Sequence, residues 1–168
     1  MADINAYLSS LENLFIKNNT TTASYNISSS LTSRVQTFFK GSGGMHENIP
    51  IPKHLYPAVI TEIESHSESF MGIGNSAKRE IVASYNIACI TMYGAGSSTE
   101  GQSSENAAHE CIQLSQNVMN LLRATPRLSS TAYVLEAVVD NVEYNAKIRD
   151  EYYNHVSNIK LTVKMRTT

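Results

Sequence analysis

The run from Glu80 to Tyr93 constrains the fold most, because as a strand it would carry apolar side chains on both faces. One face would hold Val82, Ala88, Ile90 and Met92, and the other would hold Ile81, Tyr85, Ile87 and Cys89. A strand with this pattern is covered on both faces or meets another subunit. We therefore expect a β-sheet in which this segment is one of the longer strands.

Four other segments have the composition or alternation of strands. They are residues 33–39, residues 56–63 with Pro57 at the start, and two later runs at about 131–144 and 152–166. A proline at the first position of a strand removes a donor where the loss matters least. The chain before residue 39 also has apolar residues at helical spacing, but we favour a strand there. The last run alternates strictly, so one of its faces should be wet.

Two segments have the period of amphipathic helices. Apolar residues recur three and four apart over residues 3–17, which predicts an N-terminal helix within residues 1–18. A second helix is expected from Glu105 to Arg123, with Ser103 or Ser104 as its N-terminal cap. Its expected buried stripe contains Ala107, Cys111, Leu114, Val118, Leu121 and Leu122.

Residues 41–54 and 94–104 are rich in glycine, serine and proline, and we expect both to be flexible loops. The resulting order is helix, three strands, helix, two strands. This is not the regular alternation of a doubly wound parallel sheet. We predict one α+β domain over residues 1–168, with a mainly antiparallel or mixed β-sheet and two α-helices packed on one face.

The bulk composition excludes several classes of function. The 168 residues carry a net charge of −2, with 42% apolar residues and no basic run that could neutralise a row of phosphates. No stretch approaches the ~18 apolar residues of a membrane span, and the N-terminus lacks the order of a signal peptide. We expect a cytoplasmic location, no membrane partner, and buried thiols at Cys89 and Cys111.

The stretch from Gly96 to Ser103 has the glycine spacing of a phosphate-binding loop, and Asp140 ends an apolar run that could supply a magnesium ligand. However, Gln102 stands where such a loop needs lysine to reach the phosphates. Glu100 would add a carboxylate where the anionic nucleotide must lie. We expect a solvated loop there and no nucleotide.

Glu62, Glu64, His66 and Glu68 alternate and could share one face of a strand as a metal-binding cluster. The same alternation is typical of a solvated strand face, which we favour, with the chain fraying after residue 64. His109 and Glu110 do not form a zinc-protease motif, and no histidine has the spacing of a hydrolase triad. We therefore predict no catalytic residues, no metal and no cofactor.

The layout of these segments resembles the tail terminator proteins of long-tailed bacteriophages, with related neck and tail-completion proteins close behind. The resemblance rests on the N-terminal helix, the glycine-rich loop and the run Leu55 to Ile60. It rests also on the long strand to Tyr93, the helix to Arg123 and the alternating last strand. It covers most of the chain from about residue 34 onward. Residues 18–33 and the long connection 41–55 depart from it.

The resemblance implies a virion protein of the tail or neck, assembled in the host cytoplasm. Such a subunit would close into a homo-oligomeric ring, a hexamer in this family. The ring would cap the tail tube protein and join it to the head-tail connector or stopper protein, while DNA only passes through the lumen. A nearly neutral subunit suits that role, because a strongly basic lumen would retain the genome. The alternatives are a stopper or adaptor, a tube subunit, a generic interaction domain, and a metal- or nucleotide-binding enzyme.

A ring needs an interface in which one surface meets a different surface of the neighbour. We select candidates that are apolar and outside the expected core, or that lie in the two expected loops. The candidate assembly interface contains Phe38, Phe39, Gly43, Met45, Phe70, Met71, Gly96, Glu100, Tyr152 and Tyr153. Each aromatic residue in this set could instead belong to the subunit's own core.

Overall fold

The computed structural model describes residues 4–48, 51–72, 78–94, 100–128, 133–149 and 152–166. Its elements in chain order are α1 (Ile4–Lys17), β1 (Thr37–Ser42), α2 (Met45–Asn48), the short 3-10 helix η1 (Lys53–Leu55), β2 (Ala58–Phe70), β3 (Arg79–Gly94), α3 (Glu100–Ala124), β4 (Val134–Arg149) and β5 (Tyr152–Arg166). The order of the longer elements is the one predicted from the sequence.

The strands form one five-stranded sheet in the order β1-β2-β3-β5-β4. The short edge strand β1 runs parallel to β2, and the other three pairings are antiparallel. The predicted α+β fold with a mixed, mainly antiparallel sheet is therefore confirmed. The β3 strand lies in the middle of the sheet, as its two apolar faces require.

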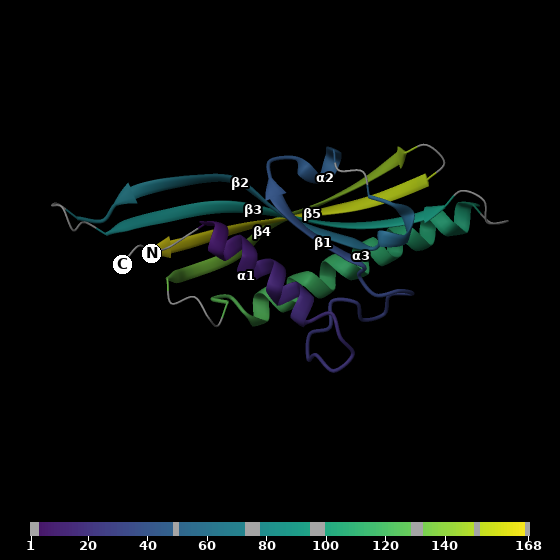
Figure 1. The fold of residues 1–168 in the computed structure, drawn as a ribbon, viewed down its shortest axis with the longest axis horizontal. Helices are drawn as coiled ribbons and strands as arrows, with labels where there is room; N and C mark the ends of the chain where they lie inside the picture. The colour runs from purple at the N-terminus through teal and green to yellow at the C-terminus, as the bar shows by residue number, and fades with distance from the viewer. Residues whose placement is uncertain are drawn as a thin grey trace.

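One face of the sheet is covered by α1 and α3, which lie on the same side (Figure 1). Helix α1 packs over β1 and β2, and α3 packs over β3, β5 and β4. The large core between them contains Tyr7, Leu11 and Phe15 of α1, Leu114, Val118 and Leu121 of α3, and the inward side chains Tyr85, Ile87, Ile159 and Leu161 of the central strands. The predicted stripes of both helices are buried.

The opposite face carries a second, smaller cluster beneath the segment that contains α2 and η1 (Figure 1). Its buried members are Ile60, Ala88, Ile90 and Val156, and Phe39, Ile51 and Tyr56 pack against them. Both apolar faces of β3 are therefore covered within one subunit, one by the large core and the other by the small cluster. At the ends of the same face Val82 and Met92 are only half-buried.

The irregular chain between α1 and β1 is held by side chain to backbone hydrogen bonds. The Asn19 amide donates to the Val35 carbonyl at 2.9 Å, and the Val35 amide donates to the Ser28 hydroxyl oxygen at 2.9 Å. From α3, the Asn117 amide donates to the Ile27 carbonyl at 3.0 Å. These bonds satisfy backbone groups that no sheet or helix pairs, so Ile27 can be buried in the core.

Several predicted boundaries are wrong. Strand β1 covers Thr37–Ser42 and not residues 33–39, and β4 continues to Arg149 instead of ending near residue 144. Helix α3 begins at Glu100, so residues 100–104 are not a loop, while residues 95–99 lie outside the described part. Glycine and serine in its first turns disfavour a helix only weakly, and a helix of 25 residues overcomes that cost cooperatively. Residues 41–54 contain the end of β1, α2 and η1, and β2 continues to Phe70 instead of fraying after residue 64.

Candidate functional site

The outer half of the β2–β3 hairpin projects beyond α1 and α3 at one end of the molecule (Figure 1). From Glu64 to Met71 every β2-side residue is exposed to solvent. We call this part of the hairpin, from Glu64 to its described end at Gly72 and from Lys78 to Ser84, the arm. On the β3 side of the arm, Ile81 and Ala83 are buried in the large core, whereas the β2 side is exposed over its described length.

Two candidate interface residues, Phe70 and Met71, lie at the described end of the β2 side of the arm, and we call this pair the tip. The Phe70 side chain is 71% exposed, the highest value among the large apolar residues that are exposed, and Met71 is 46% exposed. Arg79 stacks on the Phe70 ring, with its guanidinium carbon 4.9 Å from the ring centroid. The Arg79 Nη1 atom also donates to Glu68 Oε2 at 2.9 Å. This stacking fixes the ring on the helix-side face of the arm without covering it.

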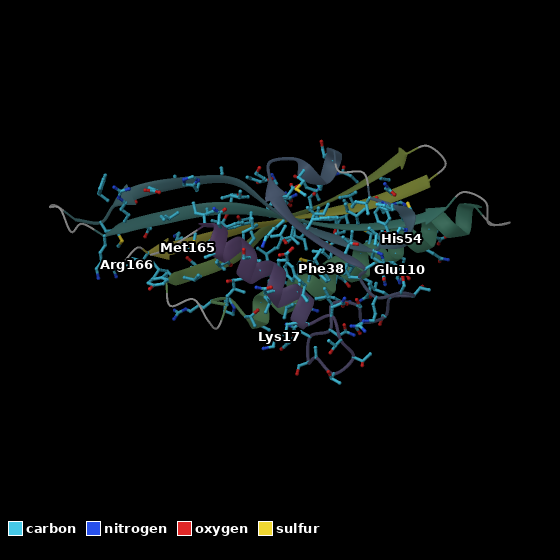
Figure 2. The ribbon with its side chains drawn as sticks, in the orientation of Figure 1. Lys17, Phe38, His54, Glu110, Met165 and Arg166 are labelled. Atoms are coloured by element: carbon cyan, nitrogen blue, oxygen red, sulfur yellow. The ribbon has the colours of Figure 1, made fainter. Side chains whose placement is uncertain are left out.

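Phe38 and Phe39 of the candidate interface are partly buried and pack within the subunit. Phe38 packs against the large core, and Figure 2 shows it in the middle of the molecule near α1. Phe39 points to the opposite face and packs against the small cluster. Adjacent residues of a strand face opposite ways, so a pair of phenylalanines in β1 serves both cores.

Gly43 and Met45 belong to the structured cover of the small cluster. Gly43 and Gly44 follow β1 with φ values of 27° and 78°, in the left-handed region that glycine tolerates. The Gly43 amide donates to the Ile63 carbonyl at 3.0 Å, and Met45 begins α2 with its side chain against Gly41. The segment is therefore a folded cap over the sheet, not a mobile loop.

A buried charged group holds this cap to the sheet. The Glu62 side chain, 1% exposed, accepts a hydrogen bond from the His46 backbone amide and lies 2.9 Å from His46 Nδ1. The backbone contact is made through Oε1 and the ring contact through Oε2, so both carboxylate oxygens face α2. Asn86 of β3 is paired with Glu62 across the sheet.

The pKa of the Glu62 carboxyl reflects two opposing effects. Burial disfavours the charged form and by itself would raise the pKa. The hydrogen bonds from the His46 ring and backbone and the charge of His46 outweigh that effect, so the pKa lies below its ordinary value of 4.5. Glu62 is therefore a carboxylate at neutral pH. This pair was not predicted, because the alternation of Glu62 with Glu64, His66 and Glu68 indicated a solvated strand face.

The predicted metal alternative fails on geometry. A register shift between Ile63 and Ser65 inserts Glu64 as an extra residue in β2. After this bulge, His66 pairs with Ala83 and lies on the helix-side face, whereas Glu62 lies on the other face. Among the residues whose placement is described, no group of three or more His, Cys, Asp or Glu side chains could hold a metal ion.

The proposed phosphate loop and the two tyrosines are only partly described. Gly96 lies outside the described residues, and Glu100 is the first residue of α3. Asp140 lies in the edge strand β4 and accepts a hydrogen bond from Thr162 of β5. The backbones of Tyr152 and Tyr153 pair with Gly94 and Tyr93 of β3, and their side chains lie outside the description.

Cys89 and Cys111 are buried free thiols, as predicted. The Cys111 Sγ donates to the Cys89 carbonyl at 3.5 Å, which joins α3 to β3. Burial raises the pKa of Cys111 to about 11 and also raises the pKa of Cys89. Both thiols are therefore protonated at neutral pH and act as small core side chains.

Neither a protein-family model nor a curated protein matches the sequence. Within the described residues, no helix is both long and apolar enough to cross a membrane. The exposed tip of the arm and the capped opposite face are thus the features on which a functional proposal can rest.

Proposed function

We propose that this chain is a structural virion protein that closes into a ring, caps a phage tail tube and joins it to the head-tail connector. The observation that carries the proposal is the exposure of Phe70 and Met71 at the described end of the β2 side of the arm. Apolar side chains gathered at such a tip are unfavourable in water, so they favour a partner protein.

The order of the elements supports the same proposal. The N-terminal helix, the structured glycine turn, the strand after Pro57, the long β3, helix α3 and the alternating β5 occur in the order on which the resemblance rests. The partners in this proposal are further copies of the chain, in a ring that the resemblance makes hexameric, the tube protein, and the connector or stopper.

The charge of the subunit fits a channel through which DNA only passes. The side of the sheet away from α1 and α3 carries both signs, with Lys160 near Glu64 at 3.7 Å and Lys164 near Glu136 at 3.7 Å. The opposite charges in such exposed pairs neutralise each other and contribute little to the free energy of folding. With a net charge of −2 for the whole chain, a ring would not hold phosphates tightly.

The proposal is tested by measuring the solution mass of the purified protein by light scattering and imaging the same sample by negative stain. We expect closed rings, either in the free protein or on adding isolated tail tubes, and each ring should stop tube growth. Open-ended tubes of the chain alone would make it a tube subunit. A monomer that ignores tube ends would contradict the proposal and favour a stopper or adaptor.

A further inference from the structure

An apolar groove lies between α3 and the edge of the sheet, at the end of the molecule opposite the arm. It has a volume of about 170 Å³ and is lined by Ala108, Cys111 and Ile112 of α3, by Tyr144 and Ala146 of β4, and by His155 of β5. Ile112 is 42% exposed and Tyr144 is 50% exposed. The groove is therefore a second apolar surface that the subunit leaves open.

The tip and the groove of one chain cannot meet. Phe70 pairs with Arg79 of β3, whereas Ala146 pairs with His155, which pairs with Thr91 of β3. The path from Arg79 to Thr91 along one strand corresponds to about 40 Å at the usual rise of a strand. Both surfaces can be covered at once only by another molecule.

The groove has the size of an aromatic side chain. A dry apolar cavity of about 150 Å³ is enough to bind benzene, and this groove holds about 170 Å³. The Phe70 ring, held out by Arg79, presents such a group on a rigid hairpin. Burying a phenylalanine side chain contributes roughly 1.5–3 kcal/mol in general.

The charges beside the two surfaces are also complementary. Lys78 is exposed at the tip, and its carbonyl accepts the Met71 amide at 2.8 Å. On α3, Glu105 is exposed and lies three residues before Ala108 and seven before Ile112, which places it on the helix face at the groove rim. A tip entering the groove could bring Lys78 toward Glu105, while Arg79 stays paired with Glu68.

We propose that the tip of the arm, Phe70 with Met71, inserts into the α3–β4 groove of a second copy of this chain. This inference rests on the proposed function, because it names the contact that would build the ring. The contact is heterologous, since a tip meets a groove, so two joined copies together keep one free tip and one free groove. Repetition then closes a ring or, if the rotation does not close, extends a filament.

The test uses one variant on each surface, Phe70→Ser on the tip and Ile112→Glu in the groove, with Val138→Ser as the control. Val138 is also exposed, at 44%, but pairs with Thr162 and lies on the other face of the sheet. Each interface variant alone should have the light-scattering mass of one chain, and the control should assemble like the wild type.

An equimolar mixture of Phe70→Ser and Ile112→Glu chains gives the sharpest result. The first chain keeps its groove and the second keeps its tip, so one productive contact remains and the mixture should have the mass of two chains. An interface built from the same surface on both copies would give no such dimer. The substitutions Met71→Ser and Ala146→Glu repeat the experiment at exposed positions, so a misfolded variant does not decide it.

Charge reversal provides an independent test of the same contact. Lys78→Glu should raise the dissociation constant of the assembly several-fold, and adding Glu105→Lys should restore it. Rings that persist in both Phe70→Ser and Ile112→Glu would overturn this contact and leave the ring proposal intact. A wild-type chain that stays monomeric at every concentration, with and without tubes, would overturn both.

Discussion

The two faces of the sheet are covered in different ways. On one face, α1 and α3 bury an extensive core that includes whole stripes of both helices. On the other, the four residues of α2 and the adjoining chain cover a cluster of only four buried side chains. The first cover is held by apolar area along two long helices, and the second depends on the polar contacts of Glu62 with His46.

This difference teaches which part of the subunit can rearrange. A cover with few apolar contacts and one buried carboxylate has a lower free energy of local opening than a face packed under two helices. We therefore expect the cap over the small cluster to open locally at a lower free energy than the helical face. The substitutions below compare the two faces, from the largest expected effect to the smallest.

The largest difference is expected from the same truncation on each face. Ile159 and Ile60 are both fully buried, the first in the large core and the second in the small cluster. Truncation of a buried isoleucine to alanine costs about 2–5 kcal/mol, and less where neighbours can collapse into the space. We expect Ile159→Ala near the top of that range and Ile60→Ala near the bottom, measured by urea unfolding.

Equal losses at the two sites would show that the α2 cover is as rigid as the helical one. If Ile159→Ala does not fold, Ile159→Val and Ile60→Val carry the same comparison at about 0.5–1.5 kcal/mol. Unchanged dependence of the unfolding free energy on urea would show that the denatured state is the same in the variants.

The sequence predicted the long elements because their signals are local. Strict alternation in β5 and the stripe of α3 each arise within one element, and the α3 stripe and the odd-numbered residues of β5 from Ser157 to Met165 are buried. The face of β5 that was expected to be wet is exposed at Lys164 but buried at Val156, which belongs to the small cluster. The sequence could not place Phe38 and Phe39, because two adjacent apolar residues in a strand show only that both faces are covered, not by what. Their assignment required the tertiary arrangement of α1 and α2.

The failures at the site have a similar physical cause. The bulge at Glu64 changes which face every later residue of β2 points to, and no local feature of the alternating glutamates reveals it. The His46–Glu62 pair joins residues 16 apart in different elements, so its formation depends on the turn at Gly43 and Gly44. One signal was present: a carboxylate directly after the apolar run that ends at Thr61 suggests a buried, paired charge.

The second expected effect concerns the attachment of α2. Glu62→Gln removes the charge and one of the two acceptor oxygens that face His46, and should lower the free energy of unfolding at pH 7 by about 1–3 kcal/mol. The matched control is Glu64→Gln, which alters an exposed pair with Lys160 at 3.7 Å and should change it by less than about 0.5 kcal/mol.

The pH dependence of stability shows whether Glu62→Gln acts by removing the charge or by disturbing the packing. The folded-state pKa of Glu62 is lowered below 4.5, so its contribution to stability is present above pH 4.5 and is lost as the pH falls through the folded-state pKa. The wild type and Glu62→Gln should therefore converge in stability as the solution is acidified below pH 4.5. A constant gap across that range would mean that the glutamine disturbs packing and that the ion pair contributes nothing.

The smallest expected effect comes from the turn that leads from β1 into α2. Gly44 has a φ of 78°, a conformation in which an L side chain is strained by about 1–2 kcal/mol, so Gly44→Ala should destabilise the fold by about that amount. Gly72 is the control, because its φ lies outside that region and nothing lies within 4 Å of an added Cβ atom. Gly72→Ala should leave thermal unfolding almost unchanged.

If the turn acts only on the cap, Gly44→Ala should increase hydrogen exchange at the α2 amides while the protected amides of β3 and β5 exchange as in the wild type. Equal acceleration in β3 and β5 would show that the cap and the helical face unfold as one unit, and the contrast between the two faces would then be wrong.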